Sequence, residues 1–358
     1  MPPRSKLLTI VLMLCLAPLA LAHPGHDAKE HHAEESQAAT ARVVVGWGAH
    51  AFQTMPEKCN PPDGEFYGAT HGGGAVDSAG NIYITLDNNQ FQAGILVYNK
   101  DGAFVKGIAP GLTGLHSLMY NEEDGVGYLY AARVSGDMGA YKIGLDGQVI
   151  AKMAPPAEQR GGRYRPTGVA VAPNGDVYLA DGYGSNFIFQ FDKDGNFIRR
   201  FGGGGQGDGQ FRTCHGIAVD LRGDEPRLLI CDRENRRLQY FTMDGAFISV
   251  STTGLRRPCA VSFHGDNAAV AELAGRAVIL DKDNHIVSIL GDQPNQGFRA
   301  NFRVEPKDWV EGVFNAPHGL TYTNEGDLVI CEWNARGRFA YLQRIPEEQA
   351  PEAPADVE

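Results

Sequence analysis

Short runs of alternating hydrophobic and polar residues follow one another along most of the chain. Four such runs occur in one well-defined stretch, at residues 167–172, 176–181, 187–192 and 196–201. They are rich in β-branched and aromatic residues, which favour strands. Asn174-Gly175 and Asp194-Gly195 separate two pairs of runs and are typical of tight turns. The pattern predicts four consecutive antiparallel strands.

This four-strand unit recurs along the sequence. The first run of each copy begins at residues 72, 116, 167, 215, 259 and 318, so the spacings are 44, 51, 48, 44 and 59 residues. A period of about 40–50 residues is typical of a propeller blade. Six copies predict an all-β, six-bladed β-propeller with four-stranded blades, a fold that protects its sheet edges by closing a ring.

Ring closure requires a strand from elsewhere in the chain. The last copy has only three strands of its own, because an acidic, proline-rich tail begins at Pro346. Val43-Val44-Val45 is a short β-branched run near the other end of the predicted propeller. We therefore predict that residues 43–45 pair with residues 339–345 and complete the last blade.

The ends of the chain differ in composition from the repeats. Residues 1–22 have basic residues before an apolar run and Ala20-Leu-Ala22 at its end, which is typical of a secretory signal. The predicted organisation is a signal peptide at 1–22, a histidine-rich flexible leader at 23–42, a propeller at 43–345 and a disordered acidic tail at 346–358. The mature chain is thus expected to be exported, periplasmic or secreted, with no transmembrane segment.

The leader contains four histidines among acidic residues and has little apolar content. It is interpreted either as a solvated flexible segment or as a weak site for divalent metal. The histidines are His23, His26, His31 and His32.

The net charge of the chain limits its expected partners. The formal net charge is −11, and removal of residues 1–22 takes away two basic residues and no acid, which gives −13. Nucleic acid is therefore not an expected partner.

Five cysteines remain after residue 22, an odd number that argues against a full disulfide framework. They are expected to be buried free thiols in strand cores.

Three of the six copies begin with histidine at the same position, namely His116, His215 and His318. Innermost strands line the channel of a propeller, so histidines in the second, fourth and sixth blades are expected about 120° apart around its axis. Three imidazoles with a fourth position open form a ligand set of catalytic zinc. Imidazole also binds copper, nickel and iron, and zinc is preferred here. His71 lies one residue out of register and is not expected to be a ligand.

Two loop residues are candidates for chemistry beside these histidines. Tyr183 and Arg233 follow second strands, whose ends return to the face where the histidines lie. A tyrosine near a cation can act as a base, and an arginine can bind a carboxylate through two parallel hydrogen bonds. Spacing alone leaves open the alternative that both are ordinary loop residues in hydrogen-bond networks.

Several of these segments resemble NHL-repeat propellers, and among them the peptidyl-α-hydroxyglycine α-amidating lyase domain. The resemblance is strongest over the third and fourth copies, weaker over the second and sixth, and slight in the first and fifth. It implies that the three histidines bind zinc, that Tyr183 is the base, and that Arg233 binds the substrate carboxylate. The implied reaction splits a carbinolamide into an amide and glyoxylate. The matching segments are Arg165-Pro-Thr-Gly-Val-Ala-Val, Tyr178-Leu-Ala-Asp-Gly-Tyr183, Gly209-Gln-Phe211, Cys214-His215 and Cys231-Asp-Arg-Glu-Asn235.

The sequence also departs from that family's pattern. No arginine stands near Leu86-Asp87, where the family has one, and Ala316 and Gly319 replace a methionine and an acid. These departures argue against the family's structural calcium. Its disulfide cysteines are absent too, and three of their places are taken by Gly184, Leu229 and Tyr240.

Two classes of function agree with these features. One is a zinc-dependent carbon–nitrogen lyase similar to peptidylamidoglycolate lyase, with a small or peptide-derived carboxylate as substrate. The other is a non-catalytic NHL propeller that binds a protein or ligand on one face.

Overall fold

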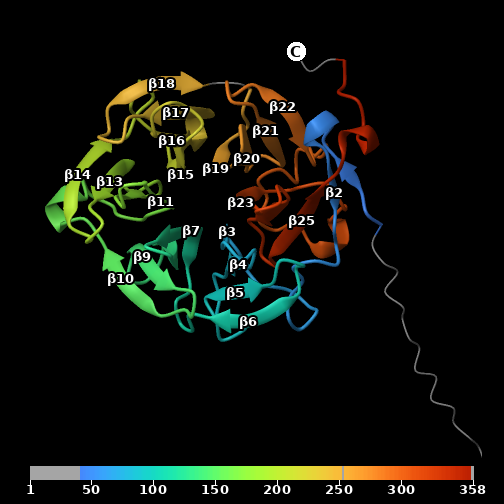
Figure 1. The fold of residues 1–358 in the computed structure, drawn as a ribbon, viewed down its shortest axis with the longest axis horizontal. Helices are drawn as coiled ribbons and strands as arrows, with labels where there is room; N and C mark the ends of the chain where they lie inside the picture. The colour runs from blue at the N-terminus through green and yellow to red at the C-terminus, as the bar shows by residue number, and fades with distance from the viewer. Residues whose placement is uncertain (1–40, 252–253, 356–358) are drawn as a thin grey trace, which may run out of the picture. The chain divides into compact units, whose positions relative to one another are not determined.

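The computed structural model describes residues 41–251 and 254–355. In these residues the strands form six separate antiparallel sheets in a ring around a central channel (Figure 1). Helical structure in the same residues consists of five single 3₁₀ turns, and no helix there is long and apolar enough to cross a membrane. The predicted six-bladed, all-β architecture is confirmed.

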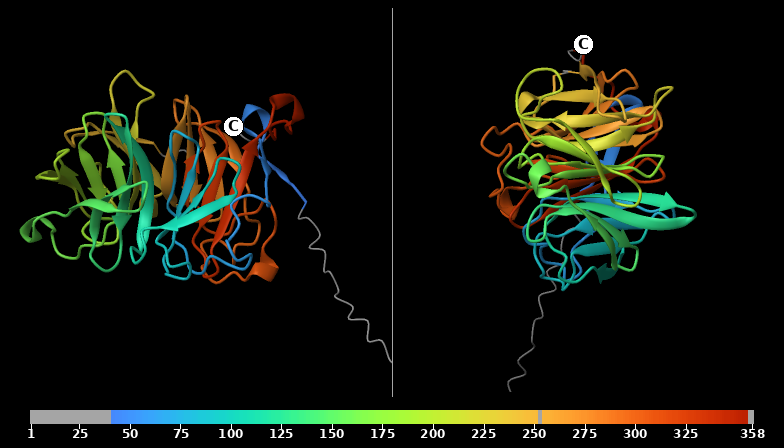
Figure 2. Two further views of the ribbon diagram at one scale, coloured as in Figure 1. Left: turned by 60° about the horizontal axis from the view of Figure 1, so that its bottom comes forward. Right: turned by 90° about the vertical axis from the view of Figure 1, so that its left-hand side faces the viewer.

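The first five blades each use four strands in chain order from the channel outward. Twisted sheets are visible in the side views (Figure 2). Blade one contains β3 (Gly74–Val76), β4 (Ile82–Thr85), β5 (Ile95–Tyr98) and β6 (Phe104–Ile108), and blade two contains β7 (Leu115–Glu123), β8 (Val126–Arg133), β9 (Gly139–Gly144) and β10 (Val149–Met153). Blade three contains β11 (Gly168–Val171), β12 (Val177–Ala180), β13 (Phe187–Phe191) and β14 (Phe197–Gly202), and blade four contains β15 (Cys214–Asp220), β16 (Arg227–Asp232), β17 (Arg237–Phe241) and β18 (Phe247–Ser251). Blade five contains β19 (Pro258–His264), β20 (Asn267–Glu272), β21 (Arg276–Leu280) and β22 (Ile286–Leu290). Each predicted blade start lies within two residues of the start of an inner strand.

The sixth blade combines both ends of the described chain. Its strands, from the channel outward, are β23 (Pro317–Tyr322), β24 (Leu328–Glu332), β25 (Arg338–Arg344), β2 (Phe52–Thr54) and β1 (Val44–Val45). The 3₁₀ turns of the described residues are η1 (Gly48–His50), η2 (Ala157–Gln159), η3 (Arg233–Asn235), η4 (Pro306–Asp308) and η5 (Glu347–Gln349).

The prediction that residues 43–45 pair with residues 339–345 is wrong. β2 takes that place, with Phe52 opposite Arg344, and Val44–Val45 pairs only with β2 as a fifth, outermost strand. Phe52 is 2% exposed and packs into the core between the fifth and sixth blades together with Val45, which is 7% exposed, whereas Val44 is 37% exposed. Gly46, at φ +80°, allows the chain to turn between the two short strands.

Blade three shows how the sequence determines the bounds of the strands and the turns between them. Its four strands lie within one residue of the predicted bounds at each end. In the turn before β14, the Oδ1 atom of Asp192 accepts hydrogen bonds from the backbone N–H groups of Asp194 (3.0 Å) and Asn196 (2.8 Å). Gly195 follows at φ +84°, a conformation that favours glycine. Aspartate and glycine together therefore form this hairpin turn.

The core lies between neighbouring blades. For example, Tyr130 of blade two packs in one buried cluster with Val169 and Phe189 of blade three. Outer strands are the exposed ones, as in β10, where four of five residues are exposed. Hydrophobic contact between blades thus holds the inner strands, which carry the histidines, in fixed positions around the channel.

Two further predictions concern the chain ends and the thiols. In the acidic tail, residues 347–349 form η5, and the Gly48 N–H donates to the carbonyl of Pro351 at 2.9 Å. The disordered tail at 346–358 stays a prediction. The predicted signal and leader lie outside the described residues, apart from residues 41 and 42. Buried free thiols are confirmed for the five cysteines of the described residues.

Candidate metal centre

The three candidate histidines occupy equivalent positions in the second, fourth and sixth blades. Each is the second residue of its inner strand, in β7, β15 and β23. Each also lies at an irregularity of the strand register; in β7, for example, Leu115 and Ser117 face consecutive residues of β8, so His116 is an extra residue. His318 is an extra residue in the same way, and in β15 His215 and Gly216 together lie opposite the single residue Cys231. Such bulges redirect a side chain out of the regular strand alternation.

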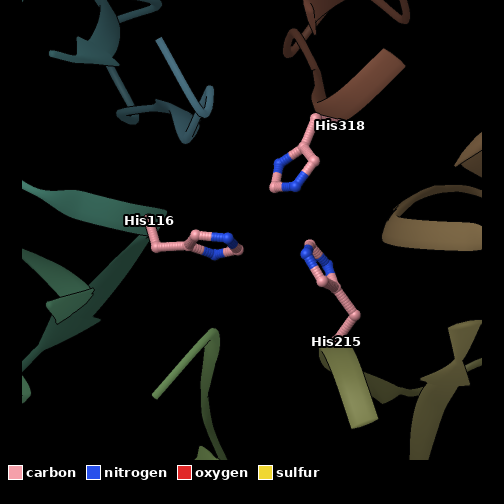
Figure 3. A group of neighbouring side chains, drawn as sticks. All are labelled: His116, His215 and His318. Carbon is pink, nitrogen blue, oxygen red and sulfur yellow. The ribbon is translucent and has the colours of Figure 1, made fainter. Parts of the chain in front are cut away.

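The histidine side chains converge on one point of the channel (Figure 3). One nitrogen from each of His116, His215 and His318 lies within 4.8 Å of the others, and the residues are only 3%, 2% and 3% exposed. This is the one such group of His, Cys, Asp and Glu in the described part of the chain. The arrangement expected from the alternating blades is therefore present, and it can hold a metal ion.

Backbone carbonyls orient two of the three imidazoles. The Nδ1 atom of His116 donates to the carbonyl of Thr167 at 2.7 Å, and that of His215 donates to the carbonyl of Cys259 at 2.8 Å. A carbonyl only accepts, so Nδ1 carries the proton and the Nε2 lone pair faces the common centre. A hydrogen bond from the other ring nitrogen to a carbonyl is usual for metal-binding histidines. The Nδ1 atom of His318 has no hydrogen-bond partner among the described residues.

Burial also sets the charge state of these imidazoles. It lowers the pKa of His116, His215 and His318 well below the usual value, and neighbouring imidazoles or the Arg233 guanidinium lower it further. The three side chains are therefore neutral near pH 7, the form that binds metal. The donor set thus fits a divalent ion that prefers imidazole nitrogen.

These pKa shifts predict a pH-dependent stability. Between the lowered folded-state pKa and about pH 6.5 an unfolded histidine is protonated while the buried one is not, so the unfolding free energy falls as pH decreases through that range. Each histidine contributes up to about 1.4 kcal/mol per pH unit. Urea unfolding of the metal-free protein between about pH 7.5 and about pH 5.5 measures the slope. A His215→Gln protein should show a smaller slope than the wild type, and an equal slope would contradict the assignment.

Tyr183 reaches the same centre from the loop after β12. Its hydroxyl lies 3.3 Å from Nε2 of His116, 3.1 Å from that of His215 and 3.4 Å from that of His318. Burial raises the pKa of this hydroxyl, and the positive charge of Arg233 opposes the shift. The tyrosine is therefore a phenol in the protein alone, and a cation bound among the imidazoles would favour the phenolate.

A buried carboxylate holds the Tyr183 loop. Asp181, at the end of β12 and 0% exposed, accepts hydrogen bonds from the backbone N–H groups of Arg165 (2.5 Å) and Ser185 (2.7 Å). The Tyr183 N–H donates to the carbonyl of Arg165 at 3.2 Å. In blade six, Glu332 has the same role toward the N–H groups before β23. The acids that end the second strands are thus structural clamps of the loops around the centre.

Arg233 lies in η3, at the end of β16. Its Nη1 atom donates to the Tyr183 hydroxyl at 3.1 Å, and its Nε atom donates to Glu234 at 2.9 Å. Glu234 also pairs with Arg257 at 2.6 Å. The guanidinium is thereby held against the tyrosine, and its side chain is only 11% exposed.

His71 is nearer to the centre than its register suggests. Its ring centroid is 5.3 Å from that of His116 and 5.6 Å from that of His318. However, its Nδ1 atom is hydrogen-bonded to the carboxylate of Asp87, and it is not part of the three-histidine group. Sequence spacing did not indicate this pair, because both residues belong to loops outside the repeat pattern.

Two cavities adjoin the histidines. One, of about 600 Å³, is lined by Tyr183, Arg233, His71 and His318 among others. The second, of about 540 Å³, is lined by all three histidines and mainly by residues of the inner strands. A small ligand thus has room beside the tyrosine and the arginine.

Known proteins show similarity to both the fold and the sequence. A family model described as a 6-bladed beta-propeller matches residues 169–268. A probable peptidyl-alpha-hydroxyglycine alpha-amidating lyase of Caenorhabditis elegans is 34% identical over 183 residues, 49% of each chain. The chain is a six-bladed β-propeller with sequence similarity to an amidating lyase.

Other relatives agree with this result. Peptidyl-glycine alpha-amidating monooxygenase B of Xenopus laevis is 34% identical over 110 residues, 28% of this chain and 12% of that protein. The matched regions span less than half of both curated relatives. A streptogramin B lyase structure has a TM-score of 0.55 at 13% identity, covering 82% of this chain and 97% of that chain. A Bacteroides thetaiotaomicron protein of unknown function has a TM-score of 0.58 at 14% identity, covering 85% and 76%. At such identities the structures support the fold alone.

Proposed function

We propose that this protein is an exported, zinc-dependent lyase that cleaves an N-acyl-α-hydroxyglycine into an amide and glyoxylate. The observation that carries the proposal is the meeting of three neutral imidazoles, the Tyr183 hydroxyl and the Arg233 guanidinium at one point of the channel. Sequence similarity to a probable amidating lyase supports the same reaction. Export rests on the signal predicted at residues 1–22.

His116, His215 and His318 are the proposed zinc ligands. Three histidines with one further ligand position are a ligand set of catalytic zinc, and the Tyr183 hydroxyl lies 3.1–3.4 Å from all three Nε2 atoms. A zinc ion there would supply Lewis acidity to a substrate oxygen. The carbonyls of Thr167 and Cys259 would keep two of the imidazoles aimed at it.

Arg233 is the proposed ligand of the substrate carboxylate. Its Nε and Nη1 atoms are engaged with Glu234 and Tyr183, and its remaining N–H groups can donate to a carboxylate in the adjoining cavity. A carboxylate there would place the neighbouring carbinol carbon close to the Tyr183 hydroxyl.

Tyr183 is the proposed proton carrier. Its phenolate oxygen would take the proton of the substrate hydroxyl as the carbon–oxygen double bond forms and the carbon–nitrogen bond breaks. The same oxygen would then return that proton to the departing amide nitrogen. Atoms and charge balance, because the proton moves from oxygen to nitrogen and the products are a neutral amide and glyoxylate.

A direct assay tests this proposal. The purified protein is expected to contain one zinc ion per chain and to release glyoxylate from an N-acyl-α-hydroxyglycine. A chelator should abolish turnover and added zinc should restore it. The corresponding N-acylglycine, which lacks the hydroxyl, is the control and should release none. Zinc-loaded protein without turnover would reject the lyase and favour a propeller that binds a protein or ligand on one face.

A further inference from the structure

The cavity beside Tyr183 is strongly cationic. Four arginines line it, and no acidic residue is among the described residues that do so. This is unusual for a chain with a net charge of −11. Clustered charge of one sign in a partly enclosed site attracts ligands of the opposite sign. The four are Arg163, Arg165, Arg233 and Arg257.

Only two of these arginines have an acidic partner, and they share a single carboxylate, that of Glu234. Glu234 pairs with Arg233 at 2.9 Å and with Arg257 at 2.6 Å. Arg163 and Arg165 form no ion pair with an acid in the described part of the chain. The Arg165 guanidinium donates to the carbonyl of Val134, at 3.3 Å from its Nε. The cavity therefore retains two guanidinium groups that lack a carboxylate.

Arg165 is placed next to the reacting centre. Its guanidinium carbon is 5.5 Å from the centroid of the Tyr183 ring, and that of Arg233 is 5.3 Å from the same centroid. The backbone of Arg165 is fixed through Asp181 and Tyr183. Two arginines thus flank one tyrosine, and only one of them has an acidic partner in the protein.

We propose that Arg163 and Arg165 form a second anion-binding subsite, so that the preferred ligand is a dianion. Its α-carboxylate lies at Arg233, and a second anionic group, on the amide side of the molecule, lies at Arg163 and Arg165. The inference deepens the proposed lyase function and rests on it for the role of Arg233. Each charge-assisted contact to an arginine is stronger than a contact between neutral groups.

An isosteric pair of unreactive ligands tests the subsite by calorimetry on the zinc-loaded protein. The probes are N-acetyl-glutamyl-glycine and N-acetyl-glutaminyl-glycine, which share a terminal carboxylate and differ by one charge. The glutamyl probe should bind at least about tenfold more tightly, the effect of one good charge-assisted contact. Equal affinities in the wild-type protein would overturn the proposal, and this comparison depends on no variant.

Substitutions test whether the preference for the glutamyl probe depends on Arg163 and Arg165. The double variant Arg163→Gln, Arg165→Gln should lose the preference and keep the wild-type affinity for the glutaminyl probe. Arg199→Gln, on the outer strand β14, is the matched control and should keep the preference. A preference that persists in the double variant would also overturn the proposal.

The lyase assay separates this inference from the proposed reaction. Turnover of a neutral N-acyl-α-hydroxyglycine, combined with equal binding of the two probes, would reject the second subsite alone. Absence of turnover, combined with a preference for the glutamyl probe that requires Arg163 and Arg165, would reject the lyase and retain the subsite.

Discussion

Tyr183→Phe is expected to lower the kcat of the proposed lyase by about 100- to 10,000-fold, the usual contribution of a positioned acid–base group. Zinc should remain bound at one ion per chain. The substitution removes only the hydroxyl, which lies 3.1–3.4 Å from three imidazole nitrogens and 3.1 Å from Nη1 of Arg233. Glyoxylate release at saturating substrate, together with metal analysis of the same sample, measures both quantities.

Two comparisons make this experiment specific. Tyr164→Phe is the matched control, because the Tyr164 hydroxyl is buried in the preceding segment and has no hydrogen-bond partner among the described residues. It should leave kcat unchanged. Arg233→Ala should chiefly raise KM, since it removes a contact that binds the carboxylate in both the ground and transition states. Wild-type kcat in Tyr183→Phe would reject the tyrosine as proton carrier.

The blade repeat could be predicted from sequence because each blade is built mainly from local contacts. Turn residues such as Asn174-Gly175 and alternating strands specify one hairpin after another, so the inner strands begin within two residues of the predicted positions. The histidines could be placed for the same reason, since one repeated register puts His116, His215 and His318 at equivalent points.

The closing strand could not be predicted in the same way. Residues 43–45 and Phe52–Thr54 are both short, and β propensity favours the three valines. In the structure Phe52 pairs with β25 and lies with Val45 in a buried cluster formed by the fifth and sixth blades. Such a contact depends on residues about 200 or more positions away in the chain, which a local hydrophobic pattern does not encode.

The site residues that lie in loops could be predicted from the sequence only in part. The positions of Tyr183 and Arg233 beside the histidines agree with the expected return of second strands to that end of the channel. Arg163 and Arg165 were not identified as ligand-binding residues, because their segment precedes an inner strand and has no periodic pattern. The relevant signal in the sequence is two arginines, four and two residues before the predicted blade start at Thr167, without an acid beside them.

His215→Ala is expected to abolish stoichiometric zinc binding and, with it, turnover. Removal of one of three convergent imidazoles leaves two protein ligands, fewer than catalytic zinc sites use. Zinc should also stop protecting the variant against unfolding, whereas at free zinc about 100 times Kd it should stabilise the wild type by about 2.7 kcal/mol. Metal analysis and thermal unfolding with and without zinc measure these effects.

The leader requires its own control in that experiment. It has four histidines that can bind zinc independently, so both proteins should carry serine at His23, His26, His31 and His32. His285→Ala is the matched surface control, because that side chain is 73% exposed and lies in an outer turn. It should keep one zinc per chain and the full stabilisation. Stoichiometric zinc in His215→Ala would place the ion elsewhere, because the group of three histidines could then not be its binding site.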